Sequence, residues 1–182
     1  MPELAAAWNF LENSDLVASA QDVEAAVARL AGEIAGRLGG AYPLVLAVMG
    51  GAVVFAGQLL PRLRFPMDFD YVHITRYGAA TEGARIEWRV APPAGTRGRT
   101  VLVLDDILDG GHTMAAIREE LINLGAASFQ CAVLVEKMLA RRKPIRADFV
   151  GLTIPDRFVF GCGMDAKGYW RNLPEIRATK ED

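Results

Sequence analysis

The stretch VLVLDDILDGGHTM, from Val101 to Met114, decides the fold of this chain. Its apolar start predicts a strand over Thr100–Leu104 that is buried on both faces, as in a parallel sheet. Asp105 to Thr113 is predicted to be a loop, and Met114 to Leu124 a helix that Gly125 closes. Ligands of open α/β sheets bind at the carboxyl ends of the strands. The sequence therefore predicts a binding site in the loop that follows this strand.

Outward from this stretch, apolar strands alternate with helical segments. Val23, Val27, Leu30 and Ile34 recur at three- and four-residue spacing, which predicts a helix over residues 21–38. Further strands are expected at 44–48, 69–74, 129–135 and 148–152, with a short one at 86–90, and a further helix at 52–60. This alternation predicts an α/β fold with a mainly parallel sheet, flanked by helices and joined by right-handed crossovers.

The length of 182 residues fits a single domain. We expect a core of about residues 40–153, and a small hood formed by the N-terminal part together with about residues 154–182. The tail after Thr153 holds turns and aromatic residues without a clear period, so its local structure is left open.

Composition narrows the class of protein. Hydrophobic residues make up 52% of the chain and charged residues 23%, which is ordinary for a folded globular protein. Twenty basic and 22 acidic residues leave a net charge of −2, so neither a nucleic-acid partner nor a membrane partner is expected. No secretory signal or membrane-spanning run is visible, and the two cysteines, Cys131 and Cys162, are expected to be unpaired. The chain is predicted to be cytoplasmic.

The residues after the decisive strand carry chemistry. Asp105 and Asp106 place two carboxylates side by side, which suits ribose hydroxyls, directly or through a bound magnesium ion. Asp109 follows, and Gly110 to Thr113 would bring backbone N–H groups and a hydroxyl to one spot, which suits a phosphate. Each feature alone is also compatible with a helix cap or a simple turn. The whole string in this order favours a functional site.

This order of residues resembles the phosphoribosyl pyrophosphate signature of type I phosphoribosyltransferases, and the likeness to their hypoxanthine-guanine branch runs from about Leu44 to Arg171. The resemblance implies that Asp105 and Asp106 meet the ribose hydroxyls and that Asp109 faces the base. It also implies that Gly110, Gly111, His112 and Thr113 hold the 5-phosphate. The family often has Thr and Lys where this chain has Gly110 and His112. Because backbone amides do most of the phosphate binding, we expect this departure to be tolerated.

Two further segments resemble substrate loops of the family. Met49, Gly50 and Gly51 match its pyrophosphate loop, in which the resemblance implies a cis Val48–Met49 peptide bond and in which Lys is common at position 49. Taken alone, the two glycines are more typical of a plain turn. Tyr77, within the polar segment 75–85, matches a catalytic flap that excludes water, although Arg76 stands where the family usually has Ser. An ordinary surface loop is the alternative for that segment.

The base-binding residues follow from the same resemblance. Lys137 corresponds to the lysine that donates to the 6-oxo group of the purine, and Phe158 to the aromatic residue that stacks on it. Val159 and Asp165 would read the guanine 2-amino edge, and Arg171 would approach pyrophosphate. With Asp105 and Asp106, Asp165 is also expected to take part in binding Mg²⁺. The alternatives are a solvated lysine and a plain strand containing Phe158.

The expected activity is transfer of a phosphoribosyl group to hypoxanthine or guanine, with Asp109 as general base, by a homodimer or homotetramer. One competing hypothesis keeps the chemistry and changes the acceptor to xanthine, adenine or a pyrimidine. Another is a non-catalytic regulator that senses phosphoribosyl pyrophosphate, which predicts a basic face and loss of the third acid. A P-loop nucleotidase is excluded, because no glycine-rich loop ending in Lys-Ser or Lys-Thr occurs.

Overall fold

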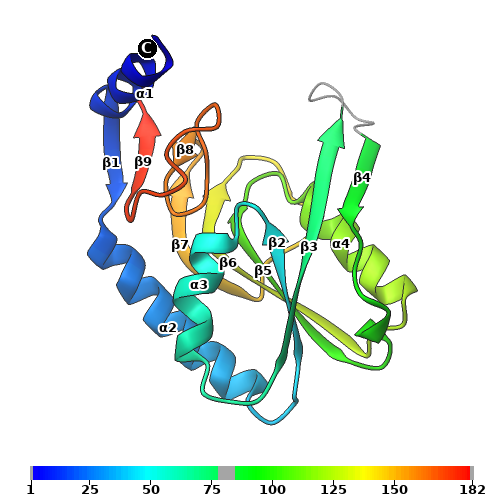
Figure 1. Cartoon of the computed structure of the whole chain (residues 1–182). Helices are drawn as coiled ribbons and strands as arrows, with labels where there is room; N and C mark the ends of the chain where they lie inside the picture. The colour runs from blue at the N-terminus through cyan, green and yellow to red at the C-terminus, as the bar shows by residue number, and fades with distance from the viewer. Residues whose placement is uncertain (1, 78–84, 181–182) are drawn as a thin grey trace.

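A computed structural model describes residues 2–77 and 85–180 of the chain. Its central sheet has six strands in the order β4-β3-β2-β5-β6-β7 (Figure 1). The strands are β2 (Leu44–Met49), β3 (Asp68–Tyr77), β4 (Arg85–Val90), β5 (Thr100–Leu108), β6 (Ser128–Met138) and β7 (Phe149–Pro155). Neighbouring strands run parallel, except that β4 is antiparallel to β3. The predicted α/β fold with a mainly parallel sheet is therefore confirmed.

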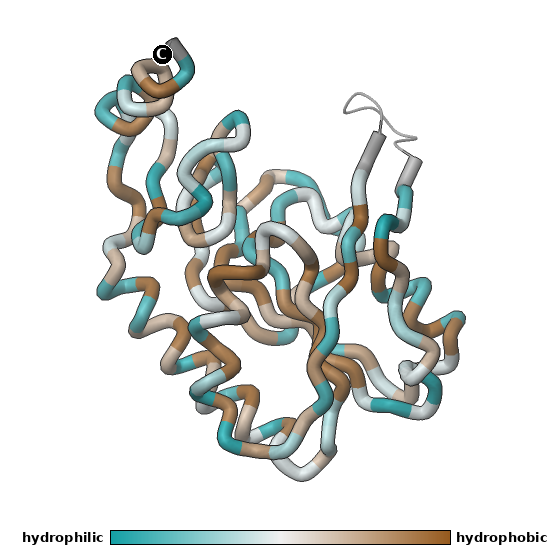
Figure 2. Tube along the Cα trace, viewed as in Figure 1, coloured by the Kyte–Doolittle hydropathy of each residue, from teal (hydrophilic) through white to brown (hydrophobic). Residues whose placement is uncertain are grey.

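The central strands are apolar on both faces because helices cover both. Along β2, Leu44, Leu46 and Val48 face one cluster of buried side chains, whereas Val45 and Ala47 face the other. Figure 2 shows the apolar residues gathered along these strands. The chain thus forms three layers, with the sheet in the middle.

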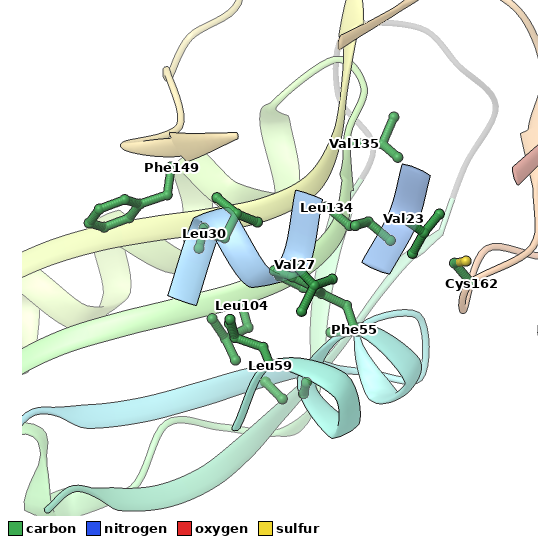
Figure 3. Close-up of a cluster of buried hydrophobic side chains, with 14 of the residues drawn as sticks. Val23, Val27, Leu30, Phe55, Leu59, Leu104, Leu134, Val135, Phe149 and Cys162 are labelled. Carbon is green, nitrogen blue, oxygen red and sulfur yellow. The ribbon is translucent and has the colours of Figure 1, made fainter. Parts of the chain in front are cut away.

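One face is covered by α2 (Ala20–Leu38) and α3 (Val53–Leu59), and the other by α4 (His112–Asn123). In Figure 3, Val27 and Leu30 of α2 and Phe55 and Leu59 of α3 pack toward Leu104 of β5. Ser19 starts α2 with a capping box, in which it and Asp22 satisfy each other's backbone N–H groups. These helices pack on both faces of the sheet whose strand ends carry the predicted site residues.

The strands β5 and β6 are longer than predicted. Pairing between them continues through Asp105 with Val133 to Leu108 with Glu136, so the expected loop at 105–113 shrinks to residues 109–111. The expectation failed because acidic side chains rarely continue a buried strand, whereas here the backbone ladder holds them there. The helix α4 begins at His112 rather than Met114.

A second sheet, which we call the hood sheet, has three strands in the order β1-β9-β8. These are β1 (Ser14–Ala18), β8 (Val159–Phe160) and β9 (Ile176–Thr179), and they lie beside the carboxyl ends of the central strands, with α1 (Pro2–Glu12) next to them (Figure 1). The sequence did not indicate α1 or β1, nor the pairing of β1 with β9, which joins the two ends of the chain.

Two smaller expectations are also settled by the structure. Cys131 and Cys162 are unpaired, as predicted, and the structure shows that both are buried. Among the described residues, no helix is both long enough and apolar enough to cross a membrane.

Candidate active site

The end of β5 and the loop that follows it form the wall of a cavity of about 290 Å³. The parallel sheet places the end of β2 next to the end of β5, so residues far apart in the sequence meet there. The predicted residues that line this cavity are Met49, Gly51, Asp105, Asp106, Asp109, Gly110, Gly111, His112, Thr113 and Arg171.

Asp105 and Asp106 are both buried in β5, with exposed fractions of 9% and 8%. The Asp106 N–H donates to Asp105 Oδ1 at 3.0 Å. Burial raises the pKa of Asp105 well above its usual range, and the neighbouring carboxylate of Asp106 raises it further. Burial also raises the pKa of Asp106, although hydrogen bonds and the positive charge of Arg171 oppose this shift. When they are ionised, two adjacent buried carboxylates are stabilised by a bound cation or by hydroxyl donors.

The loop after β2 packs directly on this pair. A Cβ atom on Gly51 would lie 2.0 Å from Asp106 Oδ2, and a Cβ atom on Gly163 would lie 1.8 Å from the carbonyl oxygen of Gly51. Only glycine fits at both positions. Gly50 is exposed, and the side chain of Met49 lines the cavity.

The expected cis peptide bond is one residue away from its predicted position. It joins Met49 to Gly50, whereas Val48–Met49 was expected. Met49 still pairs with His73 of β3, so the Val48–Met49 bond belongs to a regular strand ladder and is trans. The irregular backbone begins where the ladder ends.

Gly110 to Thr113 form the turn into α4. Gly111 is the N-cap residue and has a φ of +79°, a left-handed conformation that favours glycine. Having no side chain, it leaves the first amides of the helix free to bind an anion. His112 is exposed at the first helical position, and Thr113 is half-buried and lines the cavity. The predicted phosphate loop is thus formed by a helix N-terminus at the edge of the cavity.

A second cavity of about 210 Å³ shares a wall with the first. Asp106, Ile107, Asp109 and Arg171 line both cavities. The remaining lining residues of the second cavity are Lys137, Phe158, Val159, Met164 and Asp165. All the residues predicted to contact a purine base are therefore brought together.

Lys137 and Asp109 face each other in this second cavity. The Lys137 ammonium donates to Asp109 Oδ2 at 3.3 Å, and Asp156 Oδ1 lies 3.9 Å from the same nitrogen. The lysine side chain is only 10% exposed, whereas Asp109 is 55% exposed and can reach a ligand. Phe158 is 51% exposed, so much of its side chain is accessible to a ligand. The non-functional alternatives, a solvated lysine and a phenylalanine packed inside a strand, do not match this geometry.

Arg171 and Asp165 form an ion pair at the border of the two cavities. Asp165 Oδ1 accepts from Arg171 Nη2 at 2.5 Å, and Oδ2 accepts from the Gly168 N–H at 2.7 Å. Arg171 also donates to the carbonyl oxygen of Gly163 at 2.6 Å. Among residues 2–77 and 85–180, no three His, Cys, Asp or Glu side chains lie close enough together to hold a metal by themselves.

The predicted flap lies largely outside the described residues. Tyr77 is the last residue of β3 and pairs with Arg85 of β4, so the ends of segment 75–85 are strand rather than loop. Residues 78–84 fall between the described ranges.

Several residues near the site were not singled out from the sequence. Ile107 and Met164 line the second cavity, and Asp156 approaches Lys137. Ile107 stands inside the decisive stretch, between Asp106 and Asp109, and this position could have indicated it. For Met164 and Asp156 the sequence offers no comparable signal, because the hood segment brings them near.

Comparison with known proteins agrees with this geometry. Residues 14–167 match the family model "Phosphoribosyl transferase domain". The chain is 30% identical to the hypoxanthine-guanine phosphoribosyltransferase of Bacillus subtilis, over 89% of this chain and 91% of that protein. That of Streptococcus pneumoniae is also 30% identical, over 94% and 97%.

Solved structures give the same result. A hypoxanthine-guanine phosphoribosyltransferase of Bacillus anthracis superposes with a TM-score of 0.81 at 26% identity, covering 90% of this chain and 96% of that one. A mutant hypoxanthine phosphoribosyltransferase of Trypanosoma cruzi, solved as a ternary substrates complex, gives 0.84 at 26%, covering 93% and 97%. The chain belongs to the phosphoribosyltransferase family, in its hypoxanthine-guanine branch.

Proposed function

We propose that this chain transfers the 5-phosphoribosyl group of phosphoribosyl pyrophosphate to hypoxanthine or guanine, giving IMP or GMP and pyrophosphate. The observation that carries the proposal is the wall shared by the two cavities. One cavity presents carboxylates and helix amides, which suit a sugar phosphate. The other presents an aromatic face, a lysine and a carboxylate, which suit a purine. The reacting atoms of the two substrates would meet at Asp106, Ile107 and Asp109.

The sugar phosphate would bind along β5 and the start of α4. Asp105 and Asp106 would accept hydrogen bonds from the ribose hydroxyls, and the amides from Gly110 to Thr113 would hold the 5-phosphate. The amides around Gly50 and Gly51, together with Arg171, would receive the departing pyrophosphate. Met49 lines this end of the cavity.

The ion pair of Lys137 and Asp109 matches one edge of a 6-oxopurine. The O6 and N7 atoms of such a base lie next to each other on the same edge. Lys137 would donate to O6, and the adjacent Asp109 would take the proton from the imidazole ring. Adenine has an amino group in place of O6 and offers Lys137 no acceptor there. Phe158 would stack on the ring, and Val159 and Asp165 would accept from a guanine 2-amino group.

The chemistry that follows is a substitution at the anomeric carbon of the ribose. The bond to pyrophosphate loosens first and gives an oxocarbenium-like state, as in glycoside cleavage. The base nitrogen attacks from the opposite face, so the configuration inverts. Asp109 accepts the proton, and Lys137 stabilises the negative charge that grows on the purine oxygen.

The residues present fit a magnesium ion that is shared with the substrate. The buried carboxylates of Asp105 and Asp106 are oxygen ligands of the kind that Mg²⁺ prefers. A bound Mg²⁺ would neutralise charge on the pyrophosphate. Since these two acids alone do not complete a coordination shell, substrate oxygens and water would supply the rest. Asp165, the third residue expected to bind Mg²⁺, lines the second cavity and pairs with Arg171, so its part in metal binding stays a prediction.

We further infer that the chain forms a homodimer or homotetramer in the cytoplasm. Size-exclusion chromatography with light scattering tests this assembly.

The test is a rate measurement with phosphoribosyl pyrophosphate, Mg²⁺ and a panel of bases: guanine, hypoxanthine, xanthine, adenine and uracil. The rate of pyrophosphate release should be at least about tenfold higher with guanine or hypoxanthine than with adenine. Adenine offers the Lys137 ammonium no acceptor. Asp109→Ala should lower kcat by about 100-fold or more, whereas Lys137→Ala should mainly raise KM for the base. Equal rates with adenine and guanine would refute the assigned acceptor.

A further inference from the structure

Lys143 is a buried cation beside the base cavity. Its side chain is 10% exposed, and its ammonium has three partners. It donates to the carbonyl oxygen of Lys137 at 2.6 Å and to that of Leu108 at 2.8 Å, and it lies 3.2 Å from Glu136 Oε1. An ammonium has three protons, so every donor is used. The group is therefore fixed in position.

The two carbonyl groups belong to the strand ends that carry the proposed base contacts. Leu108 is the last residue of β5 and directly precedes Asp109, and Lys137 lies at the end of β6. The register between β5 and β6 ends with the pair Leu108 and Glu136. Beyond this pair, hydrogen bonds from the Lys143 ammonium connect the two strands, where a further backbone hydrogen bond would otherwise stand.

The stem of Lys143 also supports the phosphate loop. Its Cβ atom, together with Pro144 Cδ and Ile145 Cγ2, lies 3.4 Å from the place that a Cβ atom on Gly111 would occupy. The segment 143–145 thus packs against the turn that leads from Asp109 into α4. Lys143 itself lines neither of the two substrate cavities. It can therefore affect a bound substrate only through the residues that it holds in place.

We propose that Lys143 is a positioning residue, whose ammonium ties the ends of β5 and β6 together and so sets Asp109 against Lys137 at the spacing that a 6-oxopurine requires. The inference rests on the proposed roles of these two residues. Charge-assisted hydrogen bonds to two carbonyl oxygens are strong in a buried site. Without them, each strand end is free to shift, and the two base contacts lose their common geometry.

The test compares Lys143→Met with Lys143→Arg and with Arg142→Met. Methionine keeps an unbranched stem against Gly111 and removes only the charge and its donors. Arg142 is the neighbouring exposed cation, so its variant controls for loss of charge in this segment. Lys143→Met should raise KM for guanine about tenfold or more. The Kd for phosphoribosyl pyrophosphate with Mg²⁺, measured by calorimetry, should stay within about threefold of the wild-type value, because its proposed contacts are retained.

Lys143→Arg should restore KM for guanine to within about threefold, because a cation with several donors is kept. Arg142→Met should behave as wild type. A wild-type KM for guanine in Lys143→Met overturns the inference, as does an equal weakening of both substrates, which would indicate a general structural role. If Lys143→Met does not fold, Lys143→Gln takes its place, because glutamine keeps a polar group there but loses the charge and the reach to both carbonyl oxygens. A wild-type KM for guanine in that variant likewise overturns the inference. Inactive wild-type protein would refute the proposed function instead.

Discussion

At the scale of single residues, glycines decide how closely the cavity walls approach. Gly51 lies between Asp106 and Gly163, and a side chain fits at neither glycine. The atom nearest to a Cβ on Gly51 belongs to the Asp106 side chain in β5, and the atom nearest to a Cβ on Gly163 belongs to the Gly51 backbone. Neither neighbour can move far. This close packing places the proposed pyrophosphate loop directly against the proposed sugar-binding acids.

Gly51→Ala should therefore disturb the site more than the fold. Its Cβ atom would displace the Asp106 carboxylate, and overpacking of this kind costs about 1–3 kcal/mol. We expect kcat/KM for phosphoribosyl pyrophosphate to fall about tenfold or more in steady-state assays. The matched control is Gly57→Ala in α3, where a Cβ atom meets nothing within 4 Å and a helical alanine stabilises. Unchanged activity in Gly51→Ala would show that the wall can yield.

The acidic pair makes a prediction about pH. Folding raises the pKa of Asp105 and of Asp106 above their unfolded values. The folded chain therefore holds protons that the unfolded chain releases, so ionisation of the pair lowers the free energy of unfolding as pH rises. Asp105→Asn removes part of this penalty and keeps an oxygen that can accept from the Asp106 N–H.

Urea denaturation should find Asp105→Asn more stable than wild type at about pH 8, with the difference vanishing toward about pH 4. Asp105→Asn should bind phosphoribosyl pyrophosphate with Mg²⁺ more weakly than wild type does, since this binding needs ionised carboxylates. Calorimetry of wild type should accordingly show weaker binding as pH falls. A variant that is less stable than wild type at about pH 8 would contradict the buried-charge argument.

At the scale of elements, the helix α1 is attached by a few contacts. Trp170 Nε1 donates to the carbonyl oxygen of Ala7 at 2.8 Å, and the rings of Trp8 and Trp170 meet edge to face with centroids 5.0 Å apart. Trp170 follows the segment that contains Asp165 and directly precedes Arg171. The helix α1 thus rests on the part of the hood that completes the site.

Trp170→Phe should loosen α1 without unfolding the sheet. It keeps an aromatic ring and removes the indole donor, which costs about 1 kcal/mol. Chymotrypsin should then cut after Trp8 or Phe10 about fivefold faster, because cleavage follows the local opening of the helix. The internal control is the rate of cleavage within the central sheet, which should not change. Equal rates at Trp8 in both proteins would show that the hydrogen bond does not hold the helix.

At the scale of the whole molecule, the hood and the central sheet share one core. Cys162, Met164 and Ile176 belong to the same buried cluster as Val27 and Leu134 (Figure 3 draws Cys162 with members of this cluster). Cys131 is buried on the other face of the sheet. Burial raises the pKa of each thiol to about 12. The two cysteines therefore report on opening of the hood and of the sheet.

We predict one cooperative unfolding transition, as expected for a single domain. Neither thiol should react with iodoacetamide at about pH 8 in the native state, because both are buried and protonated. Along a urea series, mass spectrometry of labelled peptides should find both thiols exposed at the same midpoint. Labelling of Cys162 at a clearly lower urea concentration than Cys131 would show that the hood unfolds on its own.

Much of the fold could be predicted because it depends on local patterns. The apolar runs around Leu46 and Leu102 and the helical spacing from Val23 to Ile34 are legible without contacts. The decisive stretch also singled out Asp105, Asp106 and Asp109, which all line the first cavity. The ends of elements were less predictable. The hydrogen bonds between β5 and β6 keep Asp105 and Asp106 inside a strand, and the register of this pairing could be seen only in the tertiary structure.

By itself, the sequence determined the class of fold, the turn into α4 that is proposed to bind phosphate and the family resemblance, because each depends on residues close together in the chain. Only the tertiary structure decided the pairing of β1 with β9, the fit of Gly51 against Asp106 and the pairing of Lys137 with Asp109. It also revealed Lys143, a lysine without any local signal in sequence. These features join segments far apart in the chain, and their distances are set by how strands and loops pack, which no local pattern encodes.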